Sequence, residues 1–170
     1  MPPASLFRRL ACLAYEALLL TALLFIASFA VLPLVSRGRA TGGTPLTLPD
    51  APSRAFLFCL LFAGAAIYYV WCWTGGRRTL PQKTWRLRLV DRDGGALDYR
   101  RALVRYLAAW IGPALALAVY VGLRPYGLGG VALVLLALDY LAAFVDPDRQ
   151  FLHDRLAGTR VVADSVVPAR

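Results

Sequence analysis

Arg9, Glu16, Asp139 and Asp154 are the residues whose types and positions could carry chemistry in this sequence. Glu16 and Asp139 interrupt long apolar stretches, and an ionised carboxylate near the middle of a membrane costs roughly 2.5–3.5 kcal/mol. Such carboxylates usually face the interior of a helix bundle, in a transport path, a proton relay or a structural ion pair. These four charges are therefore the candidate functional or structural residues of the chain.

The two carboxylates have similar expected depths. Glu16 follows Arg9 by seven residues, which is about 10 Å of helix, and Asp139 precedes the end of its apolar stretch by six residues, about 9 Å. If these ends lie on the same side of the membrane, the carboxylates lie at nearly one level. A close pair there could exchange a proton or a cation, which is the functional interpretation.

The alternative interpretation is structural: the charges join the first helix to the fourth helix and the C-terminal segment. Arg9 and Glu16 share a helix face but lie nearly two turns apart, too far for an adjacent ion pair. Asp154, which follows the last apolar stretch, is the expected partner of Arg9. Both interpretations remain open from the sequence.

Composition indicates that the apolar stretches around these four charges are membrane helices. The 170 residues are 59% hydrophobic and only 17% charged, whereas soluble domains carry about 25% charged residues. Disordered chains are poor in hydrophobic residues, so disorder is excluded as well. The long apolar runs also exclude a nucleic-acid-binding domain, despite a net charge of +9. The sequence predicts an integral membrane protein with no nucleic-acid partner.

Four stretches are long enough, or nearly so, to cross a bilayer, which needs roughly 20 apolar residues. The sequence predicts an all-α membrane protein, a single domain over residues 1–170, with spans at about 10–35, 55–73, 106–123 and 126–145. The first stretch is longer than the 7–15 apolar residues of a signal peptide, so it is expected to be retained. Arg124 and Pro125 mark a tight hairpin between the last two spans.

Positive charge predicts the orientation. Fifteen of the nineteen cations lie in the N-terminal flank, in the loop 74–105 or in the tail 146–170. The positive-inside rule places these segments in the cytoplasm, as expected for a multi-pass bacterial inner-membrane protein. Anionic lipids at the cytoplasmic face are then an expected partner. An aromatic belt is expected at the same interface, from Tyr68, Tyr69, Trp71, Trp73 and Trp110.

The central loop is expected to be ordered. Residues 85–90 alternate apolar and basic side chains, a strand pattern, and residues 91–95 have turn composition. Asp98 is the expected N-cap of a helix that leads into the third span, with its arginines at headgroup level. Residues 160–162 could pair with the strand, which predicts a small cytoplasmic β-element. In the third span, a stripe of Ala114, Ala118 and Gly122 is the expected helix-packing face.

The sequence shows no nucleophile motif, phosphate loop, metal cluster or cofactor fingerprint. We therefore expect no enzyme activity, no cofactor and no metal. Two classes remain: transport of an ion or small solute through buried carboxylates, or a structural, assembly or stress-related role. Because four helices are few for a monomeric carrier, transport predicts a homo-oligomer, and the structural role predicts a membrane-protein partner.

Three segments carry a resemblance to a known family. Residues 8–16, RRLACLAYE, and residues 152–162, LHDRLAGTRVV, resemble the RDD family of bacterial membrane proteins, and residues 75–90 resemble its central segment. The family is named for one arginine and two aspartates, which match Arg9, position 16 and Asp154. The resemblance implies a polytopic membrane protein, with ion or solute transport suggested for some members.

The chain departs from the family pattern at two positions. Glu16 stands where the family has aspartate, which keeps the charge and lets the carboxylate reach further. Gln82 stands where the family usually has glycine, which argues against a tight turn at that point.

Overall fold

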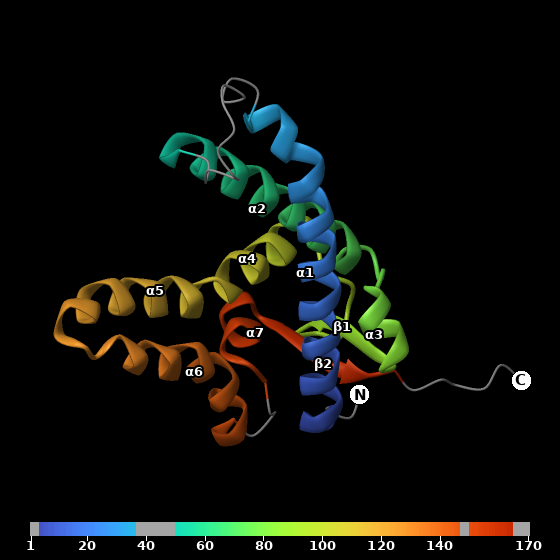
Figure 1. Cartoon of the computed structure of the whole chain (residues 1–170). Coiled ribbons are helices and arrows are strands. Elements are labelled where there is room, and N and C mark those ends of the chain that lie inside the picture. The colour runs from blue at the N-terminus through green and yellow to red at the C-terminus, as the bar shows by residue number, and fades with distance from the viewer. Residues whose placement is uncertain (1–3, 37–49, 147–149, 165–170) are drawn as a thin grey trace, which may run out of the picture.

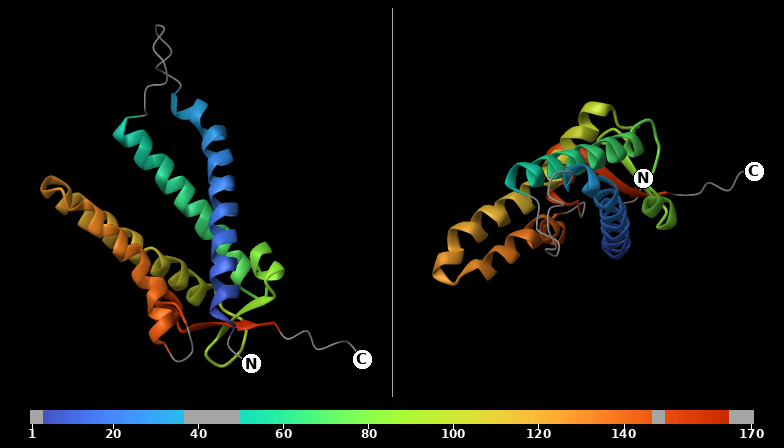
Figure 2. Two further views of the ribbon diagram at one scale, coloured as in Figure 1. Left: turned by 60° about the horizontal axis from the view of Figure 1, so that its bottom comes forward. Right: turned by 45° about the horizontal axis from the view of Figure 1, so that its top comes forward.

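Two helical hairpins project from a common base in the computed structural model (Figures 1 and 2). The structure describes residues 4–36, 50–146 and 150–164, without the side chains of residues 31–36 and 136–139. Helices α1 (Leu6–Ser36) and α2 (Ala51–Trp73) form the N-terminal hairpin, and α5 (Ile111–Leu123) and α6 (Ala132–Val145) form the second hairpin. The base consists of α3 (Leu80–Thr84), β1 (Leu87–Asp91), α4 (Tyr99–Ala109), α7 (Leu152–Ala157) and β2 (Thr159–Ala163).

Among the described residues, three helices are long and apolar enough to cross a membrane. They cover Leu6–Ala30, Ala51–Trp73 and Tyr99–Tyr126, with mean hydropathies of 2.2, 2.0 and 1.7. The third combines α4 and α5, which meet at Trp110. The junction has a physical cause, because Pro113 has no N–H to donate to the carbonyl of Ala109. The helix begins at Tyr99, directly after Asp98, which is the N-cap that the sequence predicts.

The fourth expected span is not confirmed. The prediction began it at Tyr126, but α6 begins at Ala132 and has 14 residues, about 21 Å of helix against a hydrocarbon core of about 30 Å. The turn before it is longer than expected. Two short 3₁₀ segments, Arg124–Tyr126 and Gly129–Val131, occupy the connection, with Gly127 at φ 74°. The hairpin itself is present, because α5 packs against α6.

The predicted β-element is confirmed. β1 pairs antiparallel with β2, with Leu89 opposite Val161 and Leu87 opposite Ala163. The turn after β1 is held by the Asp91 carboxylate, which accepts hydrogen bonds from the N–H groups of Asp93 and Gly95 at 3.0 and 2.7 Å. Asp98 caps α4 as expected, because its carboxylate accepts the N–H of Arg101 at 2.7 Å.

The buried core lies where the N-terminal hairpin meets the base. Tyr69 and Trp73 of α2 are buried there, with ring centroids 4.8 Å apart, and Tyr106 lies 6.2 Å from Tyr69. The aromatic-belt prediction is therefore wrong for Tyr69 and Trp73, which face the protein interior. Trp71 remains exposed and stacks with Arg77.

The expected packing stripe of the third span is also corrected. Ala114, Ala118 and Gly122 are exposed, whereas Ala116 is buried and Gly112 lies close to the backbone of Leu135 in α6. The helix therefore turns the face of Gly112 and Ala116 toward α6, which is nearly opposite the predicted face, since two residues correspond to about 200° around the helix.

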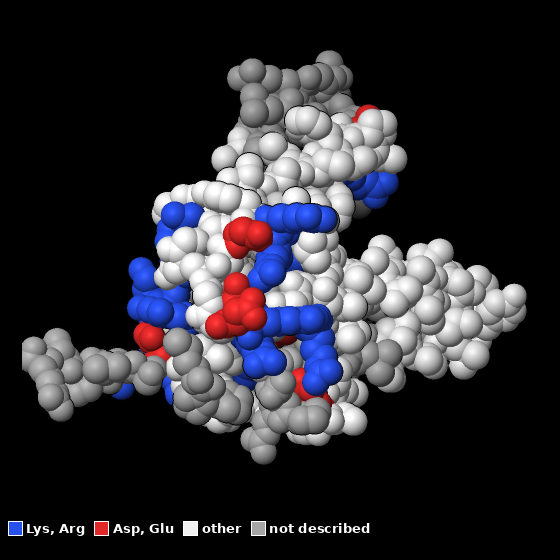
Figure 3. Space-filling view, turned by 180° about the vertical axis from the view of Figure 1, so that it is seen from behind, with Lys and Arg blue, Asp and Glu red and all other residues white. Residues whose placement is uncertain are grey.

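Charged side chains lie mainly on the base, and apolar side chains cover most of the hairpins. In Figure 3, blue and red side chains gather over the base, while the projecting second hairpin is white on that face. Large apolar side chains are exposed on the hairpins, among them Phe25, Phe29, Phe56, Ile67 and Leu117. Their apolar outer surface suits lipid rather than water.

Candidate buried charge site

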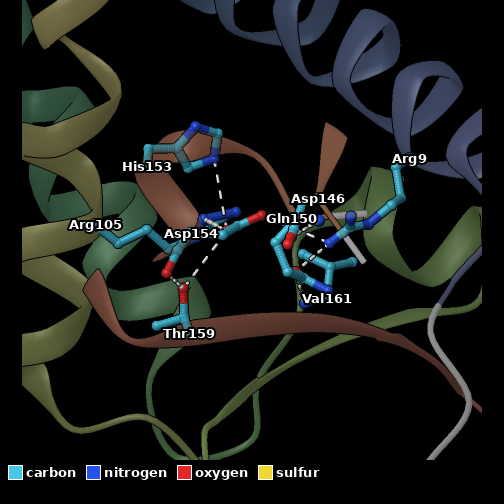
Figure 4. A network of polar contacts seen from close by, with 8 residues as sticks. All are labelled: Arg9, Arg105, Asp146, Gln150, His153, Asp154, Thr159 and Val161. Carbon is cyan, nitrogen blue, oxygen red and sulfur yellow. Dashed lines mark hydrogen bonds and ion pairs between the residues drawn. The ribbon is translucent and has the colours of Figure 1, made fainter. Parts of the chain in front are cut away.

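Asp154 lies between two arginines from different helices and is completely buried (Figure 4). Its Oδ1 accepts a hydrogen bond from Nη1 of Arg105 in α4, and its Oδ2 lies 3.6 Å from Nη2 of Arg9 in α1. The side chains of Arg9 and Arg105 are only 1% and 8% exposed. We refer to Arg9, Arg105 and Asp154 as the buried ion cluster. The expected contact between Arg9 and Asp154 is present.

The short helix α7 places Asp154 at this point. The helix begins after Phe151, whose carbonyl accepts the N–H of Asp154 at 3.1 Å, and ends at Gly158 in the left-handed conformation, φ 66°. The hydroxyl of Thr159 then donates a hydrogen bond to the carbonyl oxygen of Asp154 at 3.3 Å. His153 is also buried, with Nε2 3.6 Å from the Asp154 carboxylate. The chain direction on both sides of Asp154 is thus fixed by local hydrogen bonds.

Gln150 ties the cluster to the sheet. Its Oε1 accepts hydrogen bonds from Nη2 of Arg9 and, at 3.1 Å, from the N–H of Val161 in β2. Its own N–H donates to the carboxylate of Asp146 at 2.7 Å. Gln150 is 4% exposed, so one amide oxygen satisfies two buried donors.

Aromatic rings cover both guanidinium groups. The Cζ atom of Arg9 lies 5.3 Å from the ring centroid of Phe151, and that of Arg105 lies 4.6 Å from the ring centroid of Trp73. Arginine suits such positions because its planar group stacks on rings and is weakly hydrated. The electrostatic attraction to the ring faces adds to the attraction of Asp154.

Glu16 lies on the same helix as Arg9 but is held by another segment. Its Oε1 accepts a hydrogen bond from the hydroxyl of Thr79 at 2.6 Å. Thr79 is the N-cap of α3, and Gln82 completes a capping box, since its Oε1 accepts the N–H of Thr79 at 3.0 Å. Gln82 thus lies in a helix, not in the tight turn that the glycine of the family pattern suggests.

A central cavity of about 220 Å³ lies beside the buried ion cluster, and its lining includes both arginines of the cluster and Glu16. Every α-helix and strand of the described ranges, α1 to α7 with β1 and β2, contributes to its lining. Its polar described lining includes Arg9, Glu16, Arg105 and His153, and aromatic rings form much of the remainder, among them Tyr69, Trp73, Tyr106 and Trp110. Charged side chains and an apolar wall therefore meet in one space.

The structure brings together three of the four predicted residues. Arg9 and Asp154 are in contact, and Glu16 lines the same cavity as Arg9. The side chain of Asp139 lies outside the described residues, so its expected pairing with Glu16 remains a prediction. The described residues hold no group of three metal-binding side chains.

Arg105 is the main residue that the sequence interpretation missed. It was expected at headgroup level, but the structure buries it at 7% exposure. The signal was its helical position, since Ala102, Arg105 and Tyr106 share the buried face of α4. Gln150 and Thr159 carried no such signal, because their roles depend on the fold of the base.

Comparison with known proteins identifies the family of the chain. The model of the RDD family matches residues 3–158, nearly the whole chain, and this range includes Arg9, Glu16 and Asp154. The chain therefore belongs to the RDD family. No match was found among curated proteins or among solved structures.

Proposed function

We propose that this member of the RDD family is a four-span inner-membrane protein of bacteria that transports an ion or small solute through the central cavity. The observation that carries the proposal is the cavity itself, where Glu16 lies beside an apolar wall within helices suited to a bilayer. A carboxylate in such a position is typically functional. In this account Glu16 holds the coupling proton or cation, and a homo-oligomer completes the path.

The arrangement of the hairpins supports the proposed topology. Helix α1 runs away from the base, and α2 runs back to it. Helices α4 and α5 together run away from the base again, and α6 runs back (Figure 2). Both ends of the described chain therefore lie on one side, and this side holds most of the positive charge. In the proposal α6 is the fourth span, and the base lies in the cytoplasm against anionic lipids.

Cysteine labelling tests this topology. Arg54→Cys and Arg101→Cys are introduced separately into a chain without its three native cysteines. A membrane-impermeant maleimide should label residue 54 in intact cells and residue 101 only after permeabilisation. The reverse pattern would contradict the proposed orientation.

Reconstitution tests transport. Purified protein in liposomes should support proton-, sodium- or solute-driven flux, and Glu16→Gln should abolish the flux while the protein still folds. Asp164→Asn is the matched control, because it also removes one carboxylate charge but lies at the surface, near Arg78 and Arg88. Equal loss of flux in both variants, or no flux in the wild type, would contradict the transport proposal.

A structural or assembly role is the second candidate, and a specific observation favours it. The buried ion cluster joins α1, α4 and α7, three segments far apart in the sequence. Paired charges with almost no exposure suit a role in holding helices together. This candidate predicts no flux for any ion, together with a membrane protein that co-purifies with the wild type and is lost with Asp154→Asn.

A further inference from the structure

We infer that the central cavity binds a small organic anion, with its carboxylate or phosphate oxygens on Arg9 and Arg105 and its apolar body against the aromatic wall. The inference begins from donors that the protein does not use. Nε and Nη1 of Arg9 and Nε of Arg105 are buried and have no hydrogen-bond partner. Both residues line the cavity, and Arg9 is only 2% exposed.

Unused guanidinium donors favour an anionic oxygen ligand. A buried N–H without a partner costs about 1–3 kcal/mol, and guanidinium N–H groups match the oxygens of carboxylates and phosphates. The Asp154 carboxylate does not satisfy them: its Oδ1 accepts a hydrogen bond from Nη1 of Arg105, and its Oδ2 lies 3.6 Å from Nη2 of Arg9 and accepts no hydrogen bond. The ligand would provide the missing acceptors.

The size and the remaining lining indicate the body of the ligand. A cavity of about 150 Å³ is large enough for benzene, and this one has about 220 Å³. The rings of Tyr69, Trp73, Tyr106 and Trp110 provide an apolar wall. A six-membered ring or a short alkyl chain attached to an anionic group therefore fits in size and in polarity.

Glu16 is the one carboxylate among the described lining residues, and it lies away from the unused donors of Arg9. It is about 10 Å from Arg9 along the axis of α1, and Thr79 donates a hydrogen bond to it. Under the proposed function, on which this inference rests for its transport aspect, a proton on Glu16 would accompany the anion. Replacing Glu16 by glutamine should therefore strengthen anion binding.

Binding of cyclohexanecarboxylate to the full chain in detergent tests the inference. Trp73 and Trp110 line the cavity, so their fluorescence should change on binding. The neutral isostere cyclohexanecarboxamide should bind at least about tenfold more weakly, because it loses the charge-assisted hydrogen bonds. Glu16→Gln should bind the carboxylate about 2- to 16-fold more tightly, the range for a unit charge at 10 Å with an effective dielectric constant between 80 and 20.

A variant that fills the cavity avoids any change to the ion cluster. Ala109→Leu narrows the space from α4, whereas Ala108→Leu adds the same atoms outside the lining. The affinity for cyclohexanecarboxylate should fall at least about tenfold with Ala109→Leu, because the added side-chain atoms occupy the space that the ligand needs. The affinity should be unchanged with Ala108→Leu. Equal binding of carboxamide and carboxylate, preferred binding of cyclohexylammonium, or no effect of Ala109→Leu would overturn the inference.

The anionic group could come from a soluble molecule or from a lipid, and nanodiscs distinguish these sources. A soluble anion should bind equally in phosphatidylcholine and in mixtures with phosphatidylglycerol. If the ligand is a lipid headgroup, phosphatidylglycerol in the nanodisc should compete with cyclohexanecarboxylate. In native mass spectrometry, bound phosphatidylglycerol should then remain on the Ala108→Leu variant but not on the Ala109→Leu variant. Binding without flux in liposomes would contradict transport alone, whereas flux without anion binding would contradict this inference alone.

Discussion

Replacing Asp154 by asparagine removes the only acid of the buried ion cluster and nearly preserves its shape. Arg9 and Arg105 then lose the carboxylate that lies between them, while both guanidinium groups stay buried, at 1% and 8% side-chain exposure. Removing one partner of a buried ion pair costs about 3–5 kcal/mol, because the other charge stays uncompensated. We expect the free energy of unfolding to fall by that amount.

The surface variant Asp164→Asn calibrates this value. Asp164 is 22% exposed and pairs with Arg78 and Arg88, which are 26% and 42% exposed. Exposed pairs are worth about 0.2–1 kcal/mol, so the same chemical change should have a much smaller effect there. The contrast between the two variants separates burial from charge.

Native cysteines provide the assay. Cys12 and Cys72 are buried and Cys59 is exposed, so a Cys59→Ser background reacts with a maleimide only where the core opens. Titration with sodium dodecyl sulfate in micelles then gives the unfolding curve for each variant. If Asp154→Asn loses no more stability than Asp164→Asn, the cluster does not hold the helices together and the reasoning is refuted.

Three further perturbations probe the surroundings of the cluster. Gln150→Leu should cost about 2–4 kcal/mol in the same unfolding assay, because two buried donors lose their acceptor, and a loss below that of Asp164→Asn would contradict this role. Thr79→Val should cost about 1–2 kcal/mol by removing the cap of α3 and the hydrogen bond to Glu16, whereas Thr79→Ser should be nearly neutral. In a chain without its native cysteines, Leu89→Cys and Val161→Cys should form a disulfide on mild oxidation, since they lie opposite in the sheet, and absence of the crosslink would contradict the register.

Much of the fold follows from local patterns. Apolar length defines α1 and α2, Asp98 marks the start of α4, and alternation in residues 85–90 marks β1. These features depend on hydrophobicity, on helix capping and on the alternation of side chains along a strand, all of which act over a few neighbouring residues. The fourth span is not confirmed, because Gly127, Gly129 and Gly130 lengthen the turn and leave fewer helical residues than the apolar stretch suggests.

The site could be predicted only in part. The contact of Arg9 with Asp154 follows from the need to pair a buried charge. Arg105 was misplaced because an arginine near a helix end normally extends to the interface, and only the packing of α4 against α7 turns it inward. Gln150 acquires its role from the sheet, since its partner Val161 is brought close by pairing with Leu89.

The contact of Arg9 with Asp154 across the protein is the central claim, and solid-state NMR in lipid bilayers measures it most directly. With ¹⁵N-labelled arginine and ¹³C-labelled aspartate, the Asp154 carboxyl carbon should show dipolar dephasing from two guanidinium groups. Arg9→Gln should remove one of them, as expected for Nη2 at 3.6 Å from Oδ2. Unchanged dephasing in Arg9→Gln would show that α1 does not contact Asp154, and would contradict the account.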